Sequence, residues 1–279
     1  MSLYKKLFVV IDPTSKKQPA LDRAIAIAQK SKGKLHLFLA IHKPVSELAE
    51  HASRKTGKQA ELKKWNDVLK GYAEQCRSQG LTAKTDACWN DHWYQSVSRA
   101  AMRADADLVV KSTFRHGKAK RLLHSTSDWT IMRHSPAPVW LVRERKGFSG
   151  KSIVAALDLE ARDEGHIRLN NSILKQARNL AALTDLPLHV VVATSKKPDF
   201  GHLLNDRDDS LEEALGIEAG RLHLVKGAPK NIIPKHAELL KADVVVIGTA
   251  ARSGAKGVLI GNTAEKILDT LSADVLSVN

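Results

Sequence analysis

Cysteine is scarce in this chain of 279 residues, and apolar runs long enough to cross a membrane are absent from the sequence. The two cysteines, Cys76 and Cys88, form no C-x-x-C pair, which excludes a disulfide framework and a four-ligand zinc knuckle. A membrane helix needs about 18 consecutive apolar residues. The apolar stretch near the N-terminus is too short for a secretion signal. We therefore expect a cytoplasmic protein in a reducing compartment, without a membrane span.

Motifs for catalysis and for metal binding are also missing. The phosphate-loop pattern G-x-x-x-x-G-K-[ST] does not occur, which excludes a Walker-type nucleoside triphosphatase. No serine, histidine and aspartate set and no carboxylate pair stands in a motif context. None of the 12 histidines has the H-E-x-x-H spacing that brings two ligands to one metal ion. We predict no catalytic residues and no metal, and a weak ATPase is the only enzymatic candidate.

Charge is distributed unevenly along the chain. Residues 1–150 carry 28 basic and 13 acidic side chains, a net charge of +15, whereas residues 151–279 carry 16 and 17, a net charge of −1. All five tryptophans also lie in the first half. A basic half favours an anionic partner such as nucleic acid or anionic lipid, although a solvated charged surface explains the same composition.

The chain repeats itself at an offset of 136 residues. Residues 106–142 align without a gap on residues 242–278, and 12 of the 37 pairs are identical. At the N-terminal ends of the two copies, KKLFVVID resembles KSIVAALD. Copies of this size are whole domains. We predict one domain over residues 1–146 and a second over 147–279, joined near the linker Arg143–Gly150.

Each copy alternates short apolar runs with segments of helical periodicity. Strands are expected over residues 7–11, 35–41, 82–87, 108–111 and 139–142, and over 153–157, 188–193, 221–225, 244–247 and 275–278. Helices are expected over residues 20–30, 60–79, 94–104 and 125–132, and over 170–183, 209–219, 231–240 and 263–271. This alternation predicts the α/β class: two tandem open parallel five-stranded sheets of the doubly wound type, forming an internal pseudo-dimer.

Ligands of such sheets bind beyond the carboxyl ends of the strands, at the point where strand order reverses. In the second copy two segments meet there. Asp158 ends the first strand, and the loop over residues 248–262 follows the fourth strand and contains four glycines. Gly261, Asn262 and Thr263 precede a helix, whose free N–H groups favour an anion. Arg252 and Lys256 supply positive charge in the same loop.

The loop carries a resemblance to a known family. In the universal stress protein family the nucleotide motif is G-x-x-G, nine residues, then G-[ST]. The second copy has Gly248, then Ala251 in place of the second glycine, then Gly261 after nine residues, then Asn262 in place of serine or threonine. The G-x-P turn at Gly227 is also similar. Both copies resemble domains of this family, and the whole chain resembles its tandem E-type members.

The resemblance implies a sheet of adenine-nucleotide alpha-hydrolase type and a non-catalytic stress-response protein that binds ATP or a related adenine nucleotide. By resemblance, Asp158 contacts the nucleoside, Gly248 makes room, and residues 261–263 hold phosphates. The implied binding set is Asp158, Gly248, Ala251, Arg252, Gly261, Asn262 and Thr263. A homodimer is a further expectation, and nucleic acid or anionic lipid bound by the basic first domain is an alternative.

The first copy departs further from the motif. Ser112, Arg115, Ser125 and Thr126 occupy the corresponding positions, so family-type nucleotide binding is not expected there. Ser125 and Thr126 are candidates to cap the following helix. The basic residues of this loop are compatible with a phosphate or a lipid headgroup as well as with solvent. Trp89 and Trp93 follow the third strand, where they either pack at the pocket mouth or stack on a base.

Overall fold

The chain divides into two units, Met1–Arg145 and Lys146–Asn279. The structure is a computed structural model that describes residues 4–48, 53–113, 121–144, 150–195, 197–204, 210–249 and 262–279. Within these ranges, the side chains of Val45, of residues 121–127 and of residues 262–263 lie outside the description.

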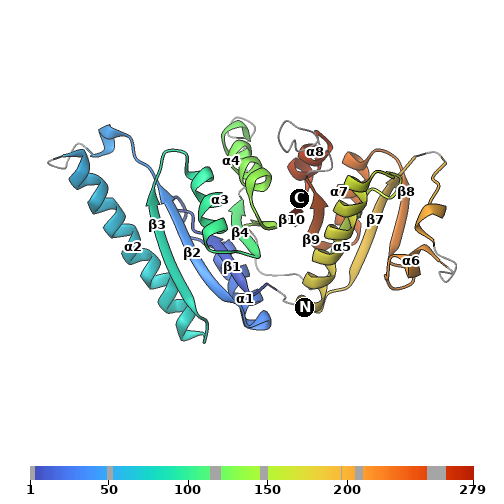
Figure 1. The fold of residues 1–279 in the computed structure, drawn as a ribbon, viewed down its shortest axis with the longest axis horizontal. Helices are drawn as coiled ribbons and strands as arrows, with labels where there is room; N and C mark the ends of the chain where they lie inside the picture. Colours follow the sequence, from blue (N-terminus) through green and yellow to red (C-terminus); the bar gives the residue numbers. More distant parts are fainter. Residues whose placement is uncertain are drawn as a thin grey trace. The chain divides into compact units, whose positions relative to one another are not determined.

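The first unit is a parallel five-stranded sheet with the strand order β3-β2-β1-β4-β5 (Figure 1). Its strands are β1 (Lys6–Val10), β2 (Lys34–Ile41), β3 (Ala83–Trp89), β4 (Leu108–Thr113) and β5 (Val139–Arg143). Its helices are α1 (Pro19–Ser31), the 3-10 turn η1 (Val45–Leu48), α2 (Arg54–Ser78), α3 (Trp93–Arg103) and α4 (Arg121–His134).

The second unit repeats this plan with the order β10-β9-β6-β7-β8, again with parallel pairs. Its strands are β6 (Ser152–Leu157), β7 (Leu188–Thr194), β8 (Leu222–Lys226), β9 (Ala242–Gly248) and β10 (Asp274–Val278). Its helices are α5 (Glu164–Thr184), the 3-10 turn η2 (Gly201–Leu203), α6 (Leu211–Ala214), α7 (Pro229–Leu239) and α8 (Asn262–Thr270). The predicted fold class of two tandem parallel α/β domains is confirmed.

Helices cover both faces of each sheet. Right-handed crossovers place α1 and α2 on one face of the first sheet and α3 and α4 on the other, where these two helices contact each other. In the second unit α5 covers one face of its own sheet, and α7 and α8, which contact each other, cover the opposite face. Because both faces are covered, the central strands β1 and β6 are almost continuously apolar and buried.

The units differ most in the segment between their second and third strands. The first unit has the 25-residue helix α2 at this position, packed along β3, whereas the second unit has only the four-residue α6. Helix α2 begins at Arg54, six residues before the predicted start, because Ser53 and Thr56 form a reciprocal capping box. Helix α5 likewise begins six residues early, at Glu164, where the Asp163 side chain accepts the N–H of His166.

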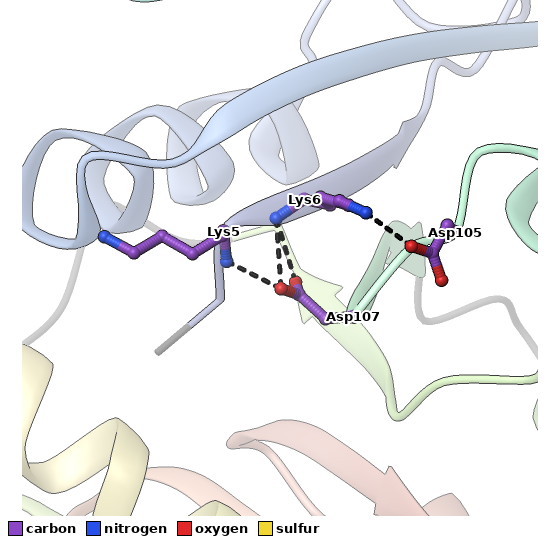
Figure 2. A network of polar contacts seen from close by, with 4 residues as sticks. All are labelled: Lys5, Lys6, Asp105 and Asp107. Atoms are coloured by element: carbon purple, nitrogen blue, oxygen red, sulfur yellow. Dashed lines mark hydrogen bonds and ion pairs between the residues drawn. The ribbon is translucent and has the colours of Figure 1, made fainter. Parts of the chain in front are cut away.

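One aspartate in each unit anchors the start of the first strand. Figure 2 shows Asp107, which precedes β4, accepting the backbone N–H of Lys5 at 2.7 Å and that of Lys6 at 3.1 Å. In the second unit Asp243, which is fully buried, accepts the N–H of Lys151 at 2.9 Å. These two aspartates are an identical pair of the repeat. Their identity therefore has a structural explanation, since they satisfy backbone donors that would otherwise be unpaired.

Non-glycine residues with positive φ end equivalent helices in the two units. Lys32 and Asp185 follow α1 and α5 at φ values of 53° and 59°. Asp105 and Lys241 follow α3 and α7 at 49° and 50°. A left-handed residue after a helix lets backbone N–H groups bond the last carbonyls. Both copies therefore keep the same backbone geometry at these ends while the side chains differ.

None of the helices in the part of the chain that the structure describes combines the length and the apolar character required of a membrane span.

Replacing either anchoring aspartate should destabilise its unit. We expect Asp107→Ala and Asp243→Ala each to lower the free energy of unfolding by about 1–3 kcal/mol, because backbone N–H groups at the strand start lose their acceptor. Urea unfolding of the full chain measures this change. The control is Asp105→Asn, which removes the exposed ion pair with Lys6 and keeps a residue that tolerates positive φ. Equal destabilisation by the control would contradict this explanation.

Candidate functional site

The expected crevice of the second unit lies where β6 and β9, which pair in parallel, end side by side. Asp158 directly follows β6, and Gly248 is the last residue of β9. Helix α8 follows the same loop and begins at Asn262, with Thr263 as its second residue. Three members of the predicted set lie outside the described residues: Ala251, Arg252 and Gly261. The structure therefore places Asp158 and Gly248 at one end of the sheet.

One amide side chain brackets the backbone of Asp158. The Nδ2 of Asn170, on α5, donates to the Asp158 carbonyl oxygen at 2.7 Å, and its Oδ1 accepts the Asp158 N–H at 3.1 Å. Both backbone groups at the strand end are thus satisfied. Asp158 is exposed, and its carboxylate accepts no hydrogen bond from the described residues.

The first unit uses the same bracket but also engages the carboxylate. Gln18 donates from Nε2 to the Asp12 carbonyl at 2.8 Å and accepts the Asp12 N–H at 3.0 Å. Here the Oδ1 of Asp12 also accepts the N–H of Thr14 at 2.8 Å and its hydroxyl at 2.6 Å. These bonds form a local turn of the kind that aspartate often makes. Asp12 is therefore already bonded within its own unit, in contrast to Asp158.

Gly248 makes room for a side chain of its own unit. A Cβ added there would lie 2.7 Å from the Cγ of Leu169, closer than real Cβ contacts. Leu169 is buried and lies in the part of α5 that precedes Asn170. Gln18 lies just before α1, whereas Asn170, which makes the same two hydrogen bonds, is the seventh residue of α5. Helix α5 therefore extends about six residues further than α1 toward the carboxyl ends of the strands. The absent side chain of Gly248 accommodates this extension.

Ser112 stands at the position of Gly248 in the first unit. Its hydroxyl, which is almost fully buried, accepts the N–H of Ala20 at 3.1 Å in the first turn of α1. The N-cap residue of α1 makes no side-chain capping bond. Ser112 therefore supplies the acceptor that this helix start requires. A side chain of the same unit thus lies at this position in both units: the Ser112 hydroxyl in the first, and Leu169 against Gly248 in the second.

A buried ion pair lies beside Ser112 in the first unit. Lys111 on β4 approaches Asp128 on α4 with 2.7 Å between Nζ and Oδ1, and both side chains are less than 15% exposed. Thr113 donates its hydroxyl to the other oxygen of Asp128 at 2.8 Å. The Lys111 ammonium also donates to the Ser112 carbonyl at 2.8 Å. The carboxyl end of β4 is thus filled by charges that neutralise each other.

The second unit has no charge at the corresponding positions. The repeat aligns Lys111 with Ile247 and Asp128 with Ala264. Helix α4 begins at Arg121, so Ser125 and Thr126 lie inside the helix and the expectation that they cap it is wrong. Arg115 lies outside the described residues. The first unit therefore has an ion pair at the end of β4, which the motif comparison did not anticipate.

Both aromatic candidates of the first unit contact cations of their own unit. The Nζ of Lys111 lies 5.5 Å from the ring centre of Trp93, and that of Lys58 lies 5.9 Å from the ring centre of Trp89. The His42 ring meets Trp89 edge to face at 5.8 Å. These contacts agree with packing at the mouth of the crevice.

The turn at Gly227 follows the sequence pattern closely. Gly227 has a φ of 142°, a conformation that side chains disfavour, and its N–H bonds the Thr194 carbonyl at 3.1 Å. Pro229 starts α7, as its fixed φ allows.

Within the described ranges, no group of three histidine, cysteine or acidic side chains is arranged to hold a metal ion. Burial raises the pKa of both thiols, Cys76 and Cys88, so that each stays protonated near neutral pH.

Sequence reasoning placed Ser112 at the motif position but missed the other residues that distinguish the two strand ends: Lys111, Asp128, Leu169 and Asn170. The repeat carried a usable signal, because a lysine and an aspartate in the first copy face an isoleucine and an alanine in the second.

Comparisons with known proteins agree with this duplicated architecture. A model of the universal stress protein family matches residues 3–143 and 156–279. The universal stress protein E of Photorhabdus laumondii is 28% identical over 305 aligned residues, which cover 100% of this chain and 96% of the relative. The protein of the same name from Escherichia coli K12 is also 28% identical, covering 99% of this chain and 94% of the relative.

Solved structures give the same picture. A putative universal stress protein of Pseudomonas aeruginosa superposes with a TM-score of 0.78 and is 29% identical, covering 99% of this chain and 94% of that chain. A universal stress protein of Archaeoglobus fulgidus has a TM-score of 0.73 at 16% identity, covering 99% and 97% of the two chains. The second likeness concerns the fold alone.

The contact between Gly248 and Leu169 predicts a specific pattern of stability. Gly248→Ala should lower the free energy of unfolding by about 1–3 kcal/mol, because the added methyl group overpacks the contact. Combining it with Leu169→Ala should remove this increment, so that the double variant is no less stable than Leu169→Ala alone. Urea unfolding of the full chain measures all three variants.

The matched control is Gly71→Ala. Gly71 lies in α2, where an added Cβ meets nothing within 4 Å. We expect this change to stabilise the chain by about 0.5–1 kcal/mol. An unchanged stability of Gly248→Ala would show that Leu169 yields without cost.

Proposed function

This chain belongs to the universal stress protein family, and we propose that it is a cytoplasmic stress-response protein whose second unit binds ATP or a related phosphorylated ligand. In this proposal the chain acts as a binding or regulatory module without catalytic residues, and two copies associate as a homodimer. The binding set is the one that the family motif implies: Asp158, Gly248, Ala251, Arg252, Gly261, Asn262 and Thr263.

The free carboxylate of Asp158 is the observation that carries this proposal. Its backbone is held by Asn170, its side chain is exposed, and no described residue donates to it. A carboxylate at the end of the first strand suits a ribose, because sugar hydroxyls donate and an ionised carboxylate only accepts. A nucleoside would supply the donor that this carboxylate does not find among the described residues.

The start of α8 supports binding of the phosphate groups. Its first residues, Asn262 and Thr263, follow β9 at the same end of the sheet as Asp158. Backbone N–H groups in a first helical turn have no intrahelical acceptor, and the helix dipole favours negative charge beside them. A ligand with a sugar at one end and phosphates at the other would engage both features.

The first unit supports the assignment by contrast. Thr14 bonds the carboxylate of Asp12, and Ser112 stands where Gly248 would be. The pair of Lys111 and Asp128 fills the end of β4 with matched charges. A ligand there would have to displace buried hydrogen-bonded partners, and breaking such a pair costs about 3–5 kcal/mol. We therefore assign nucleotide binding to the second unit.

Matched substitutions at the two aspartates test the proposal. Asp158→Ala should raise the Kd for ATP at least about tenfold, because a hydrogen bond to a charged group contributes about 1.5–3 kcal/mol. Asp12→Ala should leave that Kd unchanged. Isothermal titration calorimetry of the full chain with ATP, ADP and AMP measures both. Equal losses in the two variants would refute the assignment to the second unit, and wild-type protein that binds none of the three would refute the nucleotide proposal.

The same samples discriminate the alternatives. ATP recovered intact after incubation with Mg²⁺ agrees with a binding module, whereas ADP formation that Asp158→Ala abolishes would support a weak ATPase. Binding of single-stranded RNA or anionic vesicles that falls steeply with salt would support a separate role for the basic first unit.

A further inference from the structure

Three histidines come together on one face of the second sheet, outside the candidate crevice. They are His189 on β7, His223 on β8 and His236 on α7. The Nδ1 of His189 lies 3.0 Å from the Nε2 of His223, with the ring centres 5.2 Å apart and tilted by 30°. The ring of His236 lies 6.2 Å from that of His223, and its Nδ1 bonds the Ile232 carbonyl at 3.0 Å.

Only one hydrogen fits between the two facing ring nitrogens, which lie 3.0 Å apart. In a neutral imidazole one ring nitrogen is a donor and the other an acceptor, whereas in the charged form both are donors. A hydrogen bond between two rings therefore needs a hydrogen on one facing nitrogen and a lone pair on the other. If both rings are charged, two N–H groups face each other at hydrogen-bonding distance and the contact cannot persist.

The surroundings oppose charging of these rings. Burial is the main cause of a lowered pKa for His189, and His223 and Arg221 add to it, while Glu218 acts in the other direction. Glu218 is already paired with Arg221 at 2.6 Å. Burial also lowers the pKa of His223, with His236 as the second cause. Among the described residues, the groups that act on the pair are thus Arg221 and His236, which disfavour its protonation, and Glu218, whose carboxylate is paired with Arg221.

The position of the pair gives its protonation a structural consequence. Strand β8 is at the edge of its sheet, has five residues and pairs with β7 alone. It leads through the turn at Gly227 into α7, which carries the third histidine. The bond between His189 and His223 therefore links the edge strand β8 to β7, its one neighbouring strand among the described residues. The first unit has a single histidine at the position of His189, namely His36, with Lys84 and Asp86 nearby instead of a second imidazole.

We propose that His189 and His223 form an acid-sensitive latch that holds the edge strand β8 against β7 when at most one of the two rings is charged. Charging both rings breaks the imidazole contact and loosens β8 together with α7. This inference concerns the amino-terminal part of the sheet and is independent of nucleotide binding.

The direction with pH follows from the lowered pKa values. A histidine whose pKa is lower in the folded state stabilises that state fully at pH values above its ordinary value of 6.5. The contribution is lost as the pH falls below that value, because the opened state binds protons more tightly. The opening equilibrium of β8 should rise by up to about tenfold per pH unit for each proton bound on opening.

Hydrogen–deuterium exchange of the full chain tests the latch. Between pH 7.5 and pH 5.5, corrected for the intrinsic exchange rate, peptides covering β8 and α7 should lose protection at least about threefold. Peptides covering β3, the edge strand of the first unit, should lose less, because a single histidine with a lowered pKa, His36, lies on its neighbouring strand. In the variant His189→Asn/His223→Gln, whose amides keep a donor and an acceptor without titrating, the loss in β8 and α7 should disappear. An unchanged loss in this variant would overturn the proposal.

A pH titration of the wild-type histidines, followed by their NMR chemical shifts, gives a second test that needs no variant. We expect His189 and His223 to titrate as a coupled pair, with the second proton bound below pH 6.5 and with chemical-shift changes of the β8 amides over the same pH range. Two independent titrations near pH 6.5 would overturn the latch, and so would charging of both rings without any change in β8.

Discussion

In each unit a single amide side chain holds the aspartate that lies one or two residues after the first strand, through two hydrogen bonds to its backbone. Gln18 holds Asp12 and Asn170 holds Asp158. A strand end must satisfy its N–H and C=O groups once the sheet stops, and the bracket does so without using the aspartate side chain. The carboxylate is thereby left for another partner. The first unit bonds it to Thr14, and the second leaves it exposed. The first difference between the two units is therefore the partner of this aspartate carboxylate.

In the first unit an ion pair lies at the carboxyl end of β4. Burying Lys111 and Asp128 is costly, because desolvation takes several kcal/mol from each ion. The cost is offset by the short ion pair and by two added hydrogen bonds, one to the Ser112 carbonyl and one from the Thr113 hydroxyl. Such a network resists replacement by an outside ligand, since removing either partner leaves an unpaired buried charge. The two copies of the module thus share strand order and differ in the side chains that the described residues place at the end of the fourth strand.

The sequence was sufficient to predict the duplicated parallel sheets, because apolar runs and helical periodicity recur in register over 37 aligned residues. It also placed Asp158 and Gly248 at one end of the second sheet, since parallel strands end together. Contacts that depend on where a helix begins could not be predicted from the sequence. The start of α5 depends on the Asp163 cap, and only that start brings Leu169 over Gly248. The pairing of His189 with His223 depends on strand register, which the apolar pattern of β8 does not specify.

Gly248 illustrates why a motif residue needs a structural explanation before a functional one. Its spacing to Gly261 matches a nucleotide motif, which suggests that a ligand approaches the backbone there. The structure adds a second reason, because Leu169 already lies where a Cβ would be. These reasons are compatible, since an extended α5 that packs on Gly248 also positions Asn170 to bracket Asp158. The glycine therefore contributes to this end of the sheet through the helix it admits, and the Asp158 carboxylate, which no described residue bonds, distinguishes the second unit from the first more directly than the glycine does.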